Sequence, residues 1–159
     1  MSEPLPPFDG PLVPPAVRQE MARLRAALDA TIPRKRPLGR NLLIGTWNLK
    51  NFGSLTEKWL AGPADNPKRD FRGLWAVAEI VSRFDVVALQ EVVGDLRALR
   101  TLMKTLGPTW RFLMTDVNRG SKGAGKRMAF VFDASRVELS GLAGELVVPP
   151  EWLAEIAPN

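Results

Sequence analysis

Two polar side chains end two apolar segments of this sequence, and together they could hold a metal ion. The segment NLLIGTWNL (41–49) reaches Asn48 near its end, and DVVALQEVV (85–93) turns polar at Gln90 and Glu91. In α/β sheets, ligands bind outside the carboxyl ends of the strands. If the two segments are neighbouring strands, a carboxamide and a carboxylate reach the same edge. These oxygen groups suit a magnesium ion near phosphate. The alternative, a strand end that only meets water, stays open.

The composition limits the chemistry that these 159 residues can carry. There is no histidine, so an imidazole base, acid or metal ligand is excluded for this chain. There is no cysteine either, which argues against a structural zinc site and a disulfide framework. A metal must then have oxygen ligands, which indicates magnesium, manganese or calcium. Lys and Arg number 22 against 17 acidic residues, a net charge of +5. That charge favours polyanions such as nucleic acid, and a mildly basic protein without such a partner is an equal alternative.

The elements that must position Asn48 and Glu91 are predicted from hydrophobic periodicity. Residues 41–49 and 86–89 indicate strands, and 71–84 carries one apolar face at helical spacing. Strand, helix and strand give the start of an α/β fold with a right-handed crossover. A further helix is predicted from Gly94 to Leu106, where Gly107 and Pro108 end it.

The remainder of the sequence changes to a pattern of hairpins. We expect a strand at 109–115 and two short strands within 127–139, joined by a tight turn at Asp133 to Arg136. A strand at 144–148 and a helix at 149–156 follow. Parallel units that give way to antiparallel ones predict a mixed sheet, so the fold class is α/β (α+β).

The first 40 residues differ in composition from the rest. Residues 1–15 carry six prolines, and Val17, Met21, Leu24 and Leu28 then follow at the spacings of an amphipathic helix. The segment TIPRKRPLGR (31–40) reads as a solvated basic linker. We therefore divide the chain into an N-terminal extension, 1–40, and an α/β portion, 41–159. We expect no membrane span, no signal peptide and a cytoplasmic location.

Three motifs, LLIGTWNLKNFG, FDVVALQEV and KRMAFVFDASRVEL, resemble the endonuclease/exonuclease/phosphatase superfamily in their order and separation. The resemblance covers roughly residues 41–148. It implies a deoxyribonuclease-like fold, a four-layer α/β sandwich of two packed mixed sheets, that hydrolyses phosphate esters with Mg²⁺ or Mn²⁺. It also implies that Glu91 ligates the catalytic metal, that Asn48 helps to orient metal and phosphate, and that Arg127 lies near the phosphate backbone.

Two differences from that superfamily shape the expected function. The resemblance covers only the amino-terminal half, without the catalytic histidine and the carboxylates of the second half. Lys126 stands where the superfamily has a glutamate. We expect a metal-dependent phosphoesterase that acts on nucleic-acid phosphodiesters, lacks its carboxyl-terminal half and has little or no activity alone. A half sandwich should also expose an apolar sheet face and self-associate. The alternative is a non-catalytic nucleic-acid-binding or protein-interaction module on the same fold.

Further candidate contacts lie in the loop before the last motif. Its cations could touch a phosphate backbone or simply line a solvated hairpin edge, and they are Arg119, Lys122, Lys126 and Arg127. GSKGAGKR (120–127) resembles a triphosphate-binding loop, but Arg127 replaces the required Ser or Thr and no helix is expected to follow. Trp59, in a polar loop, is the tryptophan we consider for substrate contact.

Overall fold

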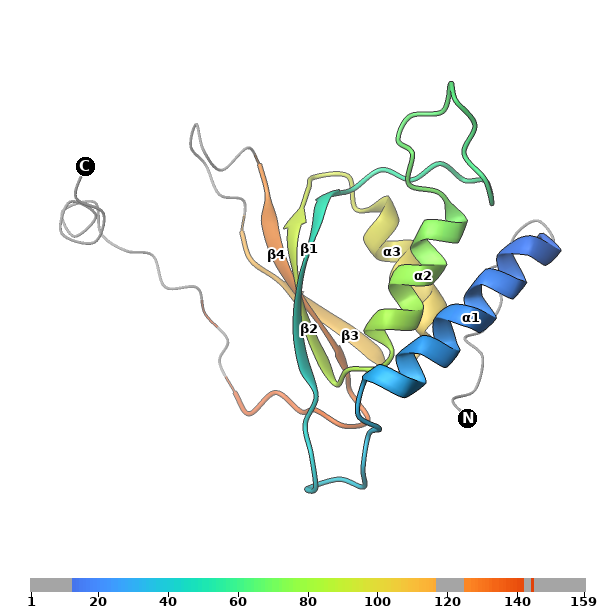
Figure 1. Cartoon of the computed structure of the whole chain (residues 1–159). Helices are drawn as coiled ribbons and strands as arrows, with labels where there is room; N and C mark the ends of the chain where they lie inside the picture. The colour runs from blue at the N-terminus through green and yellow to red at the C-terminus, as the bar shows by residue number, and fades with distance from the viewer. Residues whose placement is uncertain (1–12, 117–124, 142–143, 145–159) are drawn as a thin grey trace, which may run out of the picture.

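The computed structural model describes residues 13–116, 125–141 and 144, which form a mixed α/β fold (Figure 1). The sheet has the strands β1 (Ile44–Phe52), β2 (Val86–Val92), β3 (Trp110–Met114) and β4 (Arg127–Asp133). Their order is β1-β2-β4-β3; β1 and β2 are parallel, and β4 is antiparallel to both of its neighbours. The predicted mixed sheet is confirmed.

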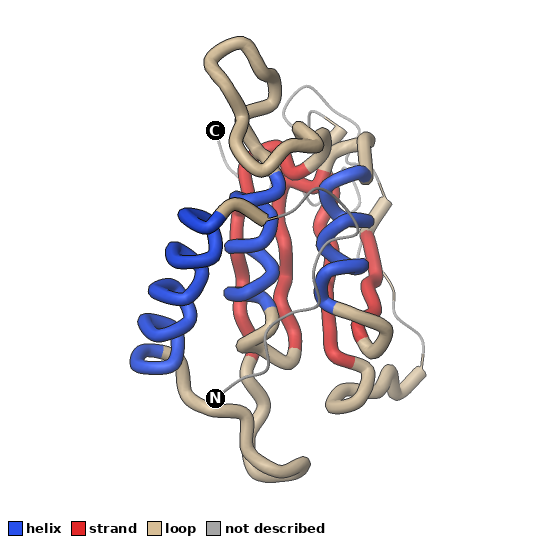
Figure 2. Tube along the Cα trace, turned by 90° about the vertical axis from the view of Figure 1, so that its right-hand side faces the viewer, coloured by secondary structure: helices blue, strands red, loops and turns tan. Residues whose placement is uncertain are grey.

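The helices lie together on one face of this sheet (Figure 2). They are α1 (Pro15–Thr31), α2 (Phe71–Val81) and α3 (Arg97–Leu106). The crossover helix α2 buries Leu74, Ala78 and Val81 completely, at spacings of four and three residues. Asp70 caps α2, because its carboxylate accepts a hydrogen bond from the Gly73 N–H at 2.9 Å. The crossover therefore makes β1 and β2 parallel, with their carboxyl ends at one edge.

Helix α1 packs on α2 and belongs to the same hydrophobic core. Val17 and Met21 are each only 1% exposed and join the core cluster with residues of α2 and the sheet. A buried carboxylate, Glu79, adds a polar contact, since it accepts hydrogen bonds from Arg25 Nε at 2.8 Å and from Trp75 Nε1 at 2.9 Å. None of the described helices is long and apolar enough to cross a membrane.

Alternation along the central strands separates a covered face from an open one. Val87 and Leu89 of β2 and Ala129 and Val131 of β4 are buried beneath the helices. Their sequence neighbours point to the opposite face, which no described helix covers. There Phe130 is 38% exposed. Within the described residues, helices thus cover one side of the sheet, and on the other side Phe130 is exposed whereas Phe132 is buried.

The structure corrects one predicted strand. Residues 137–139 form no strand, although the turn before them is present at Ala134–Arg136. Strand β4 already pairs with β2 on one side and with β3 on the other, so it has no free edge for a hairpin partner. The predicted strand 144–148 and helix 149–156 lie, but for Gly144, outside the described residues. Arg127 begins a strand rather than a helix, which removes the triphosphate-binding loop as a candidate.

Candidate functional site

The structure brings Asn48 and Glu91 into contact at the carboxyl ends of β1 and β2. Asn48 pairs in register with Gln90, next to Glu91 in sequence. The Asn48 amide Nδ2 donates a hydrogen bond to Glu91 Oε1 at 2.9 Å. We call this edge of the sheet, formed by Asn48, Lys50, Asn51, Glu91 and Lys126, the carboxylate lip.

The backbone of the lip is in an unusual conformation. Among the described residues, the non-glycine residues with left-handed φ are Lys50 (47°), Asn51 (51°) and Glu91 (61°). For Lys50 and Glu91, which unlike Asn51 do not favour the left-handed region, this conformation costs about 1–2 kcal/mol relative to the right-handed one. The pairing register shifts here in both strands, between Asn48 and Phe52 and again before Val92. Irregularities of this kind re-aim side chains and gather at functional sites.

A half-buried arginine stabilises the left-handed turn. The Arg69 guanidinium donates hydrogen bonds to the carbonyl oxygens of Leu49, Lys50 and Asn51. The distance is 3.3 Å to the Lys50 oxygen and 3.1 Å to the Asn51 oxygen. Its central carbon lies 5.1 Å from the centre of the Phe52 ring. Burial lowers the pKa of Arg69. This side chain comes from the loop before α2, so the crossover both pairs the strands and supports the lip.

The turn in its own right orients the two site residues. The Lys50 N–H donates to Asn48 Oδ1 at 2.9 Å, and the Asn51 N–H donates to Glu91 Oε2 at 3.2 Å. Since the oxygen of Asn48 is engaged by the backbone, its amide NH₂ is the group that faces Glu91. In this geometry Asn48 positions the carboxylate, and its own oxygen points away from it.

Glu91 is held as a carboxylate by its neighbours. Lys126 Nζ lies 2.6 Å from Glu91 Oε2, and the side chains of both residues are partly exposed. The hydrogen bond from Lys126, followed by those from Asn48 and the Asn51 backbone, lowers the pKa of Glu91 to about 2. The group is therefore ionised at neutral pH.

A small hollow beside Glu91 is bordered by cations. Its lining residues are Gln90, Glu91, Lys126, Arg127 and Met128. The Nε of Arg127 is buried and has no hydrogen-bond partner among the described residues. An unpaired guanidinium N–H is a donor for a phosphate oxygen. Two other predicted contacts, Arg119 and Lys122, lie outside the described residues.

The lip contains one carboxylate, a ligand type that Mg²⁺ prefers. Within the described ranges, no three carboxylate, histidine or cysteine side chains gather to hold a metal. Mg²⁺ in proteins often has one or two carboxylates, with waters and substrate phosphates as its other ligands. The ionised Glu91, with its side chain 25% exposed, fits that pattern. Lys126 already contacts one oxygen of the same carboxylate.

Sequence reasoning misplaced one residue and missed others. Trp59 is only 6% exposed and packs against Phe71 and Trp75, with ring centres 5.7 and 5.8 Å away, so it is a core residue. No local pattern in the sequence indicated that Arg69 supports the turn at residues 49–51. The Lys126–Glu91 ion pair was also missed, although both residues were assigned to one site.

No family model matches this chain, and a search of curated proteins finds no match either.

Proposed function

We propose that this chain is part of a divalent-metal-dependent phosphoesterase that acts on nucleic-acid phosphodiesters, with the carboxylate lip as its metal-binding portion. The observation that carries the proposal is the contact of Asn48 with an ionised Glu91 at the paired carboxyl ends of β1 and β2. The strained backbone of both strands supports it, because a fold retains such conformations where they are needed.

Each residue has a role that follows from its contacts. Glu91 would hold Mg²⁺ or Mn²⁺, and Asn48 and the Asn51 N–H would keep the carboxylate oriented. A bound metal neutralises charge on phosphoryl oxygens. Lys126 would bind the phosphate itself, and Arg127 would add its unpaired Nε after a side-chain rearrangement, because that atom is covered in this structure. The described residues contain no group placed as a general base, so we propose that other residues complete the reaction.

Metal binding tests this proposal directly. Titration of Mn²⁺ into the protein, with free Mn²⁺ followed by electron paramagnetic resonance, should show binding that Glu91→Gln abolishes. The control is Glu57→Gln, the same change at an exposed glutamate outside the lip, which should leave binding intact. Absent Mn²⁺ binding, or binding that survives Glu91→Gln, would contradict the proposal.

A second function is favoured by the ion pair at 2.6 Å between Lys126 and Glu91. An ammonium group in contact with the carboxylate supplies positive charge without a metal. The lip would then belong to a non-catalytic nucleic-acid-binding module on the same fold. A fluorescent oligonucleotide distinguishes the two functions by anisotropy. Binding by the phosphoesterase should strengthen with Mg²⁺ and weaken with a chelator, whereas binding by the module should weaken with Mg²⁺, which competes for the phosphates.

A further inference from the structure

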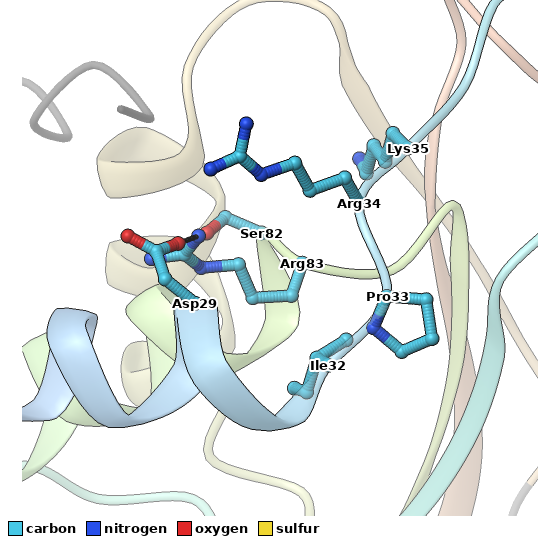
Figure 3. Close-up of a pocket in the computed structure, with 7 residues that line it drawn as sticks. All are labelled: Asp29, Ile32, Pro33, Arg34, Lys35, Ser82 and Arg83. Carbon is cyan, nitrogen blue, oxygen red and sulfur yellow. Dashed lines mark hydrogen bonds and ion pairs between the residues drawn. The ribbon is translucent and has the colours of Figure 1, made fainter.

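A second pocket lies at the other end of the molecule from the carboxylate lip. It has a volume of about 260 Å³ and is lined by Asp29, Ile32, Pro33, Arg34, Lys35, Ser82 and Arg83 (Figure 3). These residues come from the end of α1, the linker that follows it and the end of α2. Arg83 precedes β2, whereas Glu91 lies near the end of that strand. At about 3.3 Å per residue, the two sites are roughly 15 Å or more apart.

Arg83 is the unusual group in this pocket. Its side chain is 12% exposed, and Nη1 forms an ion pair with Asp29. The other edge of the guanidinium, Nε and Nη2, is buried and has no hydrogen-bond partner in the part of the chain that the structure describes. Leaving buried donors unpaired is costly, and a structure that retains them needs a water or an ion to satisfy them. These two N–H groups form the fork that binds an oxyanion through two parallel hydrogen bonds.

The charges around the pocket favour an anion. Arg34 is exposed, and its guanidinium lies on the same side of the linker as the Asp29–Arg83 pair (Figure 3). Lys35 is mostly engaged elsewhere, 3.6 Å from Asp85 and 3.7 Å from Asp133. Asp29 is the acidic residue in the lining, and it is already paired.

One feature opposes an anion here. The carboxyl ends of α1 and α2 carry partial negative charge, which repels anions by up to about 1 kcal/mol at exposed positions. Binding must therefore depend on the arginines, so removing either one should weaken it measurably.

We propose that this pocket binds an oxyanion, a phosphate or carboxylate group of a small molecule, through Arg83 Nε and Nη2 and with Arg34 as the second cation. Ile32 and Pro33 give one wall an apolar surface, which suits a ligand with an apolar part next to its anionic group. Because both Arg83 atoms are covered in this structure, binding requires side-chain rearrangement at the pocket. The site is separate from the proposed metal site and does not depend on it.

Thermal unfolding with inorganic phosphate, or with succinate as the carboxylate, tests the proposal at constant ionic strength. A ligand at tenfold its Kd should raise the Tm by roughly 3–6 °C. Stabilisation by phosphate alone, or by succinate alone, supports the site and identifies the group it takes. Stabilisation by neither would show that water satisfies Arg83, and would overturn the proposal.

Substitutions inside and outside the pocket show where the stabilising anion binds. Arg34→Gln should reduce the stabilisation at least severalfold, while Arg23→Gln, the same change at an exposed arginine of α1, should not. Arg83→Gln should abolish the stabilisation by the anion. If Arg83→Gln fails to fold, Arg34→Gln still tests the proposal. Equal stabilisation of the Arg34 and Arg23 variants would overturn the proposal. So would a loss that occurs in Lys126→Gln instead, because the anion would then bind at the lip.

Discussion

Glu91 combines a strained backbone with a side chain whose charge is stabilised by three donors. The left-handed φ of 61° turns the carboxylate toward Asn48, the Asn51 N–H and Lys126. A carboxylate that receives several hydrogen bonds loses its tendency to bind a proton, and this is why its pKa falls to about 2. The same hydrogen bonds hold its side chain in one orientation, as the proposed role of Glu91 as a metal ligand requires.

The low pKa of Glu91 predicts an acid-dependent contribution to stability. Its folded-state pKa, about 2, is below its ordinary value of 4.5, so the folded state favours the ionised form. The contribution is therefore complete above pH 4.5 and is lost as the pH falls toward 2. The difference in free energy of unfolding between the wild type and Glu91→Gln, from urea titrations, should shrink across this range. A constant difference would contradict the assignment.

Lys126 should limit metal binding at the lip. In Lys126→Met the principal cause of the lowered pKa is removed, so the pKa of Glu91 should rise toward 4.5. Without the competing ammonium, Mn²⁺ affinity should increase by roughly tenfold at neutral pH. Carboxylate ¹³C NMR titration and the Mn²⁺ assay measure the two effects. Lys104→Met, on α3, is the control that changes net charge equally. Unchanged affinity in Lys126→Met would show that the ion pair does not compete.

Whether the sequence predicts a contact between two site residues depends on how far apart they lie along the chain. Asn48 and Glu91 could be assigned to one edge, because both end apolar segments separated by one crossover. The left-handed φ of Lys50 and Glu91 could not be predicted, since neither is a residue that favours that region. Lys126 reaches Glu91 through the pairing of Val92 with Arg127, a long-range register that no local pattern specifies.

At the scale of elements, the crossover between β1 and β2 makes these strands parallel neighbours and also supports the carboxylate lip. Helix α2 was predictable because its buried residues repeat at helical spacing, and its cap, Asp70, fixes where it begins. The loop before it carries Arg69, which donates to three successive carbonyl groups at the end of β1. The strand after Arg136 was predicted wrongly, since a sequence alone does not show that both edges of β4 are occupied.

Loss of Arg69 should loosen the lip. Arg69→Met leaves the carbonyl oxygens of Leu49 and Asn51 without their donor, at a cost of roughly 1.5–3 kcal/mol in the free energy of unfolding. Amide exchange at Lys50 and Asn51 should become faster. The control is Arg72→Met, where the arginine pairs with Glu20 on the surface and contributes below about 1 kcal/mol. If both variants lose equal stability in urea titrations, Arg69 has no special role.

At the scale of the whole molecule, the sheet is covered unequally. The described helices pack on one face, with Val87, Leu89 and Val131 beneath them (Figure 2). The register places Thr46, Ala88 and Phe130 in one row across the other face. Ile44 lies on that face opposite Val86 and is 66% exposed. Open apolar faces of this kind are surfaces for association, and we propose that the second layer of a sandwich would pack here.

The open face should make the isolated chain self-associate, because burying Ile44 and Phe130 removes apolar surface from water. Sedimentation velocity should show the weight-average mass rising with protein concentration. Ile44→Thr keeps a β-branched residue in the strand while making the face more polar, so it should shift the distribution toward monomer. Leu60→Thr, at a residue 52% exposed in the loop before α2, removes similar apolar surface elsewhere and should leave association unchanged. A wild-type protein that stays monomeric at every concentration would show that this face needs no partner. Equal effects of both substitutions would show that association depends on general hydrophobicity and not on the sheet.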